Sequence, residues 1–86
     1  MQLREKTIKR LKIQSWRRGM KEMDLILGKF LDHSVHSFDE KDFQSYERLL
    51  REEDQTLFSW ISTRTGVPEE FDPIVEKIAQ FTYSKY

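Results

Sequence analysis

The residues best suited to chemistry lie in one short stretch, Trp16 to Asp24, which reads Trp-Arg-Arg-Gly-Met-Lys-Glu-Met-Asp. Arginine forks form paired hydrogen bonds to carboxylates and phosphates, and tryptophan and methionine offer wide apolar contact surfaces. These residue types are enriched where proteins bind one another. The stretch therefore predicts a docking surface for a partner and no catalytic centre.

Each of these residues also has an ordinary structural explanation. Arg17 and Arg18 would complement the negative end of a preceding helix, and Gly19 would supply a turn or a cap. Glu22 lies three residues further on, where the positive end of a following helix favours an acid. Helix capping accounts for Gly19 and Glu22 nearly as well as partner binding does, and the sequence leaves both explanations open.

The rest of the chain holds no catalytic arrangement. It contains no Ser-His-Asp order, Gly-rich phosphate loop or cysteine. A chain of 86 residues also rarely encloses a substrate and expels water from it. His33 and His36 could meet on one helical face, but no third soft ligand is evident, so we expect no metal site. Phe58 and Trp60 are expected to pack in the core.

The charges are segregated along the chain although the formal net charge is zero. Residues 1–21 carry eight basic and one acidic side chain, and residues 22–86 carry seven basic and fourteen acidic ones. A basic end of this kind can meet an acidic protein surface, a phosphate or a membrane surface. No apolar run approaches the ~20 residues needed to span a bilayer, and the start lacks the apolar segment of a secretory signal. We therefore expect a soluble protein of a reducing compartment, without membrane insertion.

Helices must position the Trp16–Asp24 stretch, because no alternating run bounded by hairpin turns is present. The pattern predicts an all-α fold, a small five-helix bundle that forms a single domain of residues 1–86. The predicted helices cover about residues 3–16, 20–35, 38–51, 54–64 and 72–84. The second is expected to be the buried central helix, since its apolar residues return every three or four positions: Met20, Met23, Leu27, Phe30 and Leu31.

Several helix starts carry capping signals. Ser37 and Glu40 fit a capping box for the third helix. Asp54 is expected to cap the fourth helix, and the fifth is expected to begin near Asp72, which would be its cap, with Pro73 at the first helical position. The first helix has an approximate apolar stripe of Leu3, Ile8, Leu11 and Ser15.

The run Arg18-Gly19-Met20-Lys21-Glu22 also resembles the Arg-Gly-x-x-Glu motif of the succinate dehydrogenase flavinylation factor family, small five-helix assembly factors of bacteria and mitochondria. The resemblance extends to Trp16-Arg17, to Leu49-Leu50 and to the segment from Asp54 through Trp60, and it spans about residues 5–83. Thr56 departs from the pattern, because an acidic residue is common there in the family.

The resemblance implies a function in assembly. Members of this family assist covalent attachment of FAD to the flavoprotein subunit of succinate dehydrogenase and, in some bacteria, to that of fumarate reductase. The implied partner is the flavoprotein subunit, whose own histidine attacks the flavin, so the chemistry and the FAD belong to the partner. We expect no tightly bound cofactor in this chain, which would be a monomer when free. The expected location is a bacterial cytoplasm, with the mitochondrial matrix as the alternative.

By position in the motif, the resemblance implies a division of roles within the stretch. Arg18, Gly19 and Glu22 would be the core contacts with the partner, flanked by Arg17, Met20 and Asp24 and supported by Trp16. Gly19 would allow close backbone approach, and Arg18 and Glu22 would present opposite charges about one helical turn apart. Gly19→Arg is expected to abolish partner binding while helical content and melting temperature stay nearly intact.

The alternative function is a small helical nucleic-acid-binding module that uses the basic first helix and the Arg17/Arg18 turn. The second helix argues against it, because a recognition helix offers polar side chains to base edges, whereas Met23, Leu25 and Leu27 are apolar. A first helix lying on a membrane surface is a third interpretation, which its short, broken apolar stripe disfavours.

Overall fold

The computed structural model describes the backbone of residues 2–83 and the side chains of residues 4–83. Within this range the chain forms five α-helices and no strand. The helices are α1 (Gln2–Trp16), α2 (Lys21–Ser34), α3 (Glu40–Leu49), α4 (Asp54–Thr63) and α5 (Asp72–Tyr83), and the short 3₁₀ helices η1 (Val35–Ser37) and η2 (Glu69–Phe71) precede α3 and α5. The predicted all-α, five-helix class is confirmed.

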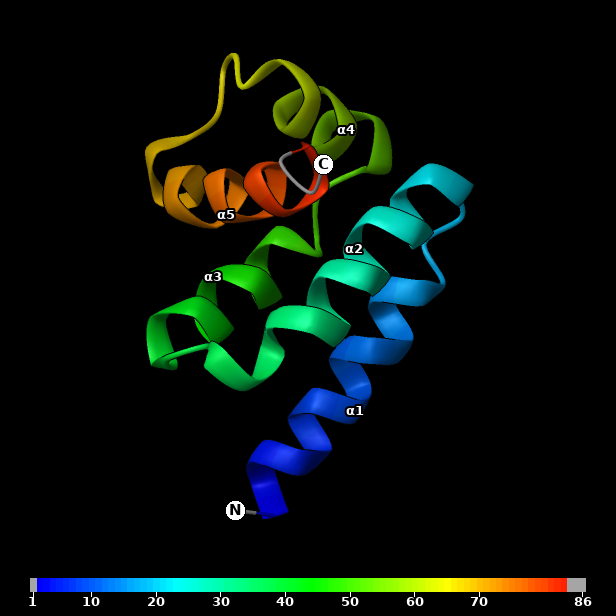
Figure 1. Ribbon diagram of the computed structural model, residues 1–86, viewed down its shortest axis with the longest axis vertical. Coiled ribbons are helices and arrows are strands. Elements are labelled where there is room, and N and C mark those ends of the chain that lie inside the picture. The colour runs from blue at the N-terminus through cyan, green and yellow to red at the C-terminus, as the bar shows by residue number, and fades with distance from the viewer. Residues whose placement is uncertain (1, 84–86) are drawn as a thin grey trace.

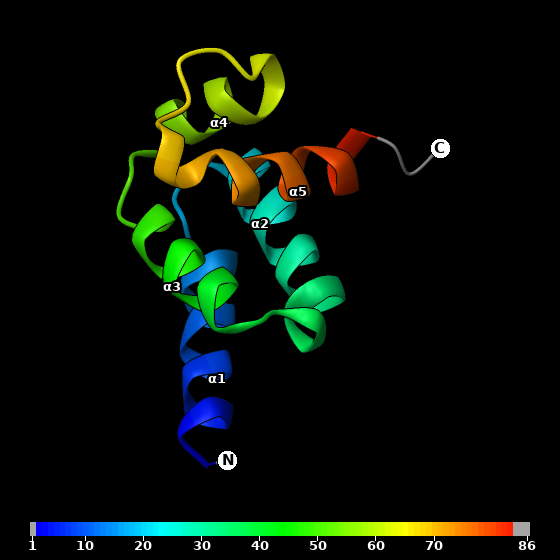
Figure 2. The same cartoon turned by 90° about the vertical axis from the view of Figure 1, so that its left-hand side faces the viewer.

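Helix α2 is the central element of the fold. It packs along α1, and its other contacts include α4 and α5 (Figure 1). Helix α5 lies across the molecule between α4 and α3, while the N-terminal half of α1 projects away from the other helices in both views (Figures 1 and 2). Met23, Leu27, Phe30 and Leu31 of α2 are buried, as the periodicity predicted. The turn between α1 and α2 therefore sits at one end of a well-packed helical hairpin.

The start of α3 differs from the predicted capping box at Ser37. After α2 the chain makes the extra turn η1, in which the Ser37 hydroxyl donates to the carbonyl of Ser34 (2.9 Å). The capping box is instead formed by Asp39, whose carboxylate accepts the amide of Asp42 (2.8 Å), while the Asp42 carboxylate accepts the amide of Asp39 (3.1 Å). Burial of Phe38 between the two turns moves the start of the helix two residues along the chain.

The other helix ends lie within one or two residues of their predicted positions. Helix α5 begins at residue 72, the predicted start, but Asp72 has helical backbone angles and is not the predicted cap, and the predicted end at residue 84 falls outside the described residues. Asp54 is the first residue of α4 and not its cap, since the cap position belongs to Glu53. On α1, Leu11 and Ser15 are buried and Ile8 is partly buried, while the side chain of Leu3 is outside the described set.

Candidate functional site

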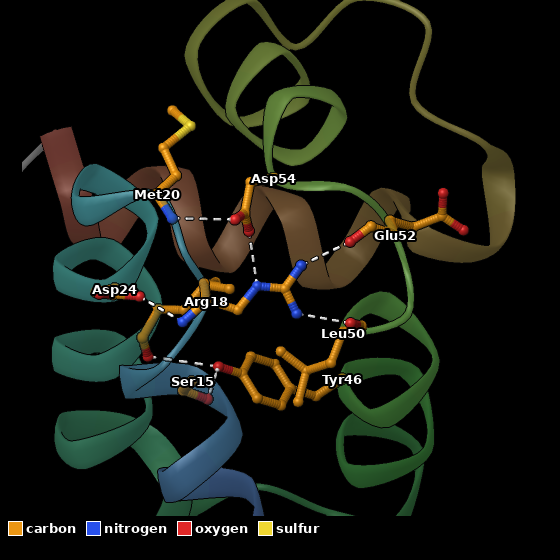
Figure 3. Close-up of polar contacts among 9 residues, drawn as sticks. Ser15, Arg18, Met20, Asp24, Tyr46, Leu50, Glu52 and Asp54 are labelled. Atoms are coloured by element: carbon orange, nitrogen blue, oxygen red, sulfur yellow. Dashed lines mark hydrogen bonds and ion pairs between the residues drawn. The ribbon is translucent and has the colours of Figure 1, made fainter.

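The turn between α1 and α2 lies against the segment that joins α3 to α4. This second segment runs from Leu50 to Asp54 and approaches the turn at the level of Arg18 (Figure 3). The two segments are more than thirty residues apart in the sequence, and one joins α1 to α2 while the other joins α3 to α4. The candidate site is therefore built from both of them.

Arg18 is the group that ties these two segments together. Its Nε donates to Asp54 Oδ1 (2.7 Å), and its two terminal nitrogens donate to the carbonyls of Leu50 and Glu52 (2.6 Å each). Both carbonyls follow the end of α3, where helices leave such groups without partners. The Arg18 side chain is only 11% exposed. Arg18 thus acts first as an internal clamp, and its expected contact with a partner stays a prediction.

Two carboxylates fix the backbone on either side of Gly19. Asp24 Oδ1 accepts the amide of Arg18 (2.5 Å), and Asp54 Oδ2 accepts the amide of Met20 (3.2 Å). Asp54 therefore bridges the Arg18 guanidinium and the backbone of the turn. The sequence had predicted that it caps α4, which it does not. The turn is held at the two amides that flank the glycine, so its shape is set before any partner arrives.

Gly19 itself adopts φ +110°, a conformation that side chains other than glycine rarely adopt. A Cβ placed there would lie 3.7 Å from Asp54 Oδ2, an ordinary contact distance, so the constraint is the backbone angle and not lack of space. This finding corrects the expectation that Gly19→Arg leaves the melting temperature nearly intact. Any larger residue strains the turn, and partner binding and stability change together at this position.

A buried hydroxyl pair lies beneath the clamp. The Tyr46 hydroxyl from α3 is 2.6 Å from Ser15 Oγ of α1, and Ser15 Oγ also donates to the carbonyl of Leu11 (2.7 Å). Burial raises the pKa of Tyr46 above its ordinary value of 10.0, and the hydrogen bond with Ser15 and the charge of Arg18 counteract only part of that effect. The neutral phenol therefore joins α1 to α3 directly below the turn (Figure 3).

Of the remaining residues of the stretch, Met23 is buried in the core, and the others are exposed or partly buried. Arg17 and Glu22 are exposed, and among the described residues neither side chain has an ion pair or hydrogen bond. Met20 is half-buried at the N-terminal end of α2, where it makes no side-chain cap. The structure thus divides the stretch into residues that shape the turn, Arg18 and Asp24, and residues whose side chains are available to a partner. The predicted contacts themselves stay predictions.

Trp16 supports the hairpin from its outer face. Its indole nitrogen donates to Asp32 Oδ2 (3.2 Å), and its ring lies directly over Gly28, where a Cβ would collide with the ring atoms. Gly28 is buried in the middle of α2, and its role was not recognised from the sequence. An isolated glycine inside a helical pattern was the available signal, because such a glycine often marks a close approach.

Trp60 and His33 lie away from the turn and contact other aromatic rings. The rings of Trp60 and Phe71 lie 5.8 Å apart, which confirms Trp60 as a packing residue. The rings of His33 and Phe81 are tilted, with centroids 4.9 Å apart, and His33 also lines an open cleft of about 850 Å³ between α2, α3 and α5, away from the turn.

Residues 2–83 include no group of three or more potential metal ligands. No helix in the same range is both long and apolar enough to cross a membrane.

Comparison with known proteins gives a consistent match. The family model described as "Flavinator of succinate dehydrogenase" matches residues 9–82 of this chain. The mitochondrial succinate dehydrogenase assembly factor 2 of Dictyostelium discoideum is 42% identical over 76 residues, which are 88% of this chain and 54% of that protein. The FAD assembly factor SdhE of Pseudomonas aeruginosa is 40% identical over 68 residues, 79% of each chain. No solved structure matches this chain.

The relatives differ in how much of them this chain spans. It covers about half of the Dictyostelium protein (54%) and 35% of the corresponding mitochondrial factor of Arabidopsis thaliana. The match to the Pseudomonas protein covers most of both chains. In this chain the part matched by the family model contains the turn, the Leu50–Asp54 segment and the buried hydroxyl pair, so it includes the whole candidate site.

Proposed function

Because this chain belongs to the family of flavinators of succinate dehydrogenase, we propose that it is an assembly factor that binds the flavoprotein subunit of that enzyme and promotes covalent attachment of FAD to it. The observation that carries the proposal is the family match over residues 9–82. In this proposal the flavoprotein subunit of fumarate reductase is a second client. The chain is a helper and not an enzyme, and the bond to the flavin forms within the partner.

The rigid turn supports a docking role. Binding costs less free energy when the contact surface is ordered beforehand. The clamp by Arg18 and Asp54 orders the Gly19 backbone, and Trp16 holds α1 on α2, so the outward side chains stand on a fixed frame. We assign the contacts to Arg17, Gly19, Met20 and Glu22, with Arg18, Asp24 and Trp16 shaping the surface.

The residues around the turn do not suit a resident FAD. A pyrophosphate is usually held by free backbone amides at a glycine-rich turn. Here the amides of Arg18 and Met20, on either side of Gly19, already donate to the carboxylates of Asp24 and Asp54. The negative charges of these two carboxylates would also repel a phosphate group placed at the turn. In the proposal, FAD therefore stays with the flavoprotein subunit, and this chain binds the protein around it.

Co-purification followed by in-gel flavin fluorescence tests the proposal. The flavoprotein subunit is produced in cells that lack their own assembly factor, with or without this chain. We expect the two proteins to co-purify and covalent flavin fluorescence to rise only when this chain is present. Equal covalent flavin in both cultures would refute the assembly role.

Glu22→Ala and Glu40→Ala form a matched pair for the same assay. Both are exposed acids in the first turn of a helix, α2 and α3 respectively, and among the described residues neither side chain has an ion pair. We expect Glu22→Ala to reduce co-purification and flavin content, whereas Glu40→Ala leaves both unchanged. Similar losses in the two variants would contradict a docking role for the Glu22 side of the turn.

The nucleic-acid alternative has no structural observation in its favour. Helix α2 would have to be the recognition helix, and its Met23 and Leu27 are buried in the core. Retention on DNA that falls with rising salt at near-physiological ionic strength would be the result that revives it. Relatives named as mitochondrial and relatives from bacteria both match, and the proposed role fits either the mitochondrial matrix or a bacterial cytoplasm.

A further inference from the structure

A second cleft, of about 580 Å³, adjoins the turn on the side of α1 and α3. Arg10 and Gln14 line it from α1, Arg17 lines it from the turn after α1, and Leu50 and Arg51 line it from the segment after α3. Arg18 and Asp54 also contribute to it, so the internal clamp separates this cleft from the Gly19 backbone. A partner that docks on the turn would cover the cleft as well.

Two arginines of this cleft have unused charges. Arg10 pairs with Glu47 across the cleft, and Arg18 is held by Asp54. By contrast, Arg17 and Arg51 are exposed, and among the described residues their guanidinium groups have neither an ion pair nor a hydrogen bond. Arg17 lies in the turn after α1 and Arg51 in the segment after α3, 34 positions apart by their numbers, and both line the same cleft. The cleft thus offers two free guanidinium forks beside the docking turn.

The composition of the walls indicates what such a cleft can hold. A guanidinium fork matches the two oxygens of a carboxylate and binds it through paired hydrogen bonds. Glu47 and Glu53 also line the cleft, and their negative charges would oppose a pyrophosphate or a nucleic-acid backbone more strongly than a single carboxylate. The excess of basic side chains in residues 1–21 also favours the approach of an acidic segment to this cleft.

We propose that this cleft receives acidic side chains from a segment of the flavoprotein partner, with Arg17 and Arg51 as the two carboxylate contacts. The inference rests on the proposed function and adds to it a second contact region, because Arg51 lies outside the Trp16–Asp24 stretch and outside the motif. The clamp then has the turn on one side and the carboxylate cleft on the other. The turn and the cleft dock as one surface, and Arg18 fixes their positions relative to each other.

The dissociation constant for the purified flavoprotein subunit tests this proposal with charge reversals. We expect Arg17→Glu and Arg51→Glu each to weaken binding by about tenfold or more, as for close charge pairs at interfaces. Arg51→Gln, which adds no repulsion to the neighbouring Glu52 and Glu53, should weaken binding by about threefold. Lys41→Glu is the matched control, since Lys41 is an exposed, unpaired cation at the opposite end of α3 within the described chain.

Controls on folding and on the occupant complete the test. Circular dichroism and melting temperature should be unchanged in all four variants, because the altered side chains are exposed and form no ion pair. Carbodiimide coupling of the Arg51→Lys variant in the complex should join position 51 to an aspartate or glutamate of the partner, which peptide mapping identifies. Inorganic pyrophosphate and FAD, titrated into the free chain by calorimetry, should show no binding.

The possible outcomes separate the two proposals. If the wild-type chain does not bind the flavoprotein subunit, the proposed function fails and this inference fails with it. If wild type binds but Arg17→Glu and Arg51→Glu bind as tightly as Lys41→Glu, only the carboxylate cleft is refuted. Pyrophosphate or FAD binding that Arg51→Glu abolishes, with unchanged affinity for the subunit, would make the cleft a phosphate site and overturn the assignment to carboxylates.

Discussion

Replacing Arg18 by alanine is expected to destabilise this protein strongly, although the residue belongs to a motif implicated in partner contact. The substitution removes three side-chain hydrogen bonds, one of them the ion pair with Asp54. It also leaves two carbonyls at the end of α3 and a carboxylate that is only 19% exposed without their partner. Hydrogen bonds to charged groups contribute roughly 1.5–3 kcal/mol each, and breaking a buried pair costs roughly 3–5 kcal/mol.

The clamp lies at the edge of the core and water can replace part of what is lost, so we expect a net loss of about 3 kcal/mol in the free energy of unfolding. In a domain of this size that loss lowers the melting temperature by about 15 °C. Urea unfolding followed by circular dichroism measures the change. Arg17→Ala, its exposed neighbour without an ion pair among the described residues, is the control and should stay within about 0.5 kcal/mol of wild type.

A double-mutant cycle isolates the Arg18–Asp54 contact. If the 2.7 Å ion pair carries a large part of the effect, Arg18→Ala combined with Asp54→Ala should cost about 2 kcal/mol less than the sum of the two single changes. Additive losses would show that the pair is not the coupling element. The clamp itself is refuted if Arg18→Ala costs less than about 1 kcal/mol while binding to the flavoprotein subunit is lost, because Arg18 would then be a contact and little else.

The other predictions concern glycines and a buried phenol near the same turn. Gly19→Ala should cost about 1–2 kcal/mol in urea unfolding, because φ +110° strains any residue with a Cβ, and an unchanged midpoint would contradict this reason. Gly28→Ala should cost about 2 kcal/mol and red-shift the fluorescence of Trp16, whose ring must move, whereas an unshifted spectrum would argue against the contact. Burial raises the pKa of Tyr46, so the stability that its neutral form provides is present below pH 10.0 and falls as pH rises above that value. Unfolding measured between about pH 8 and about pH 11 should show a shallower alkaline loss in Tyr46→Phe, and equal slopes would contradict the assignment.

The parts of the fold that depend on neighbours in the sequence were predictable, and the parts that depend on distant neighbours were not. Met23, Leu27 and Phe30 repeat at helical spacing, so the buried face of α2 could be identified before the structure was known. Two capping candidates, Ser37 and Asp39, compete for the start of α3, and the burial of Phe38 decides between them. Local hydrogen-bonding rules cannot resolve that competition, because it depends on the core.

The candidate site shows the same limit more sharply. The stretch Trp16–Asp24 could be singled out by residue type, but the inward direction of Arg18 could not, because its partners lie 32 to 36 residues away. Asp54 carried a plausible local role as a cap, which concealed its contact with the turn. Gly28 left a visible signal, a glycine inside a helix, whose cause is the ring of Trp16 from another helix.

The inward position of Arg18 changes how loss of function in this motif should be interpreted. Arg18 holds the Leu50–Asp54 segment against the turn, and Arg51 of the proposed carboxylate cleft belongs to that segment. Removing Arg18 would therefore displace both contact regions at once and abolish docking without Arg18 touching the partner. Outward variants at Arg17, Glu22 and Arg51 leave the clamp in place, so only they measure contact energy directly. If docking needs the two regions in fixed register, Asp54→Asn should weaken binding to the flavoprotein subunit even at temperatures where the variant is fully folded.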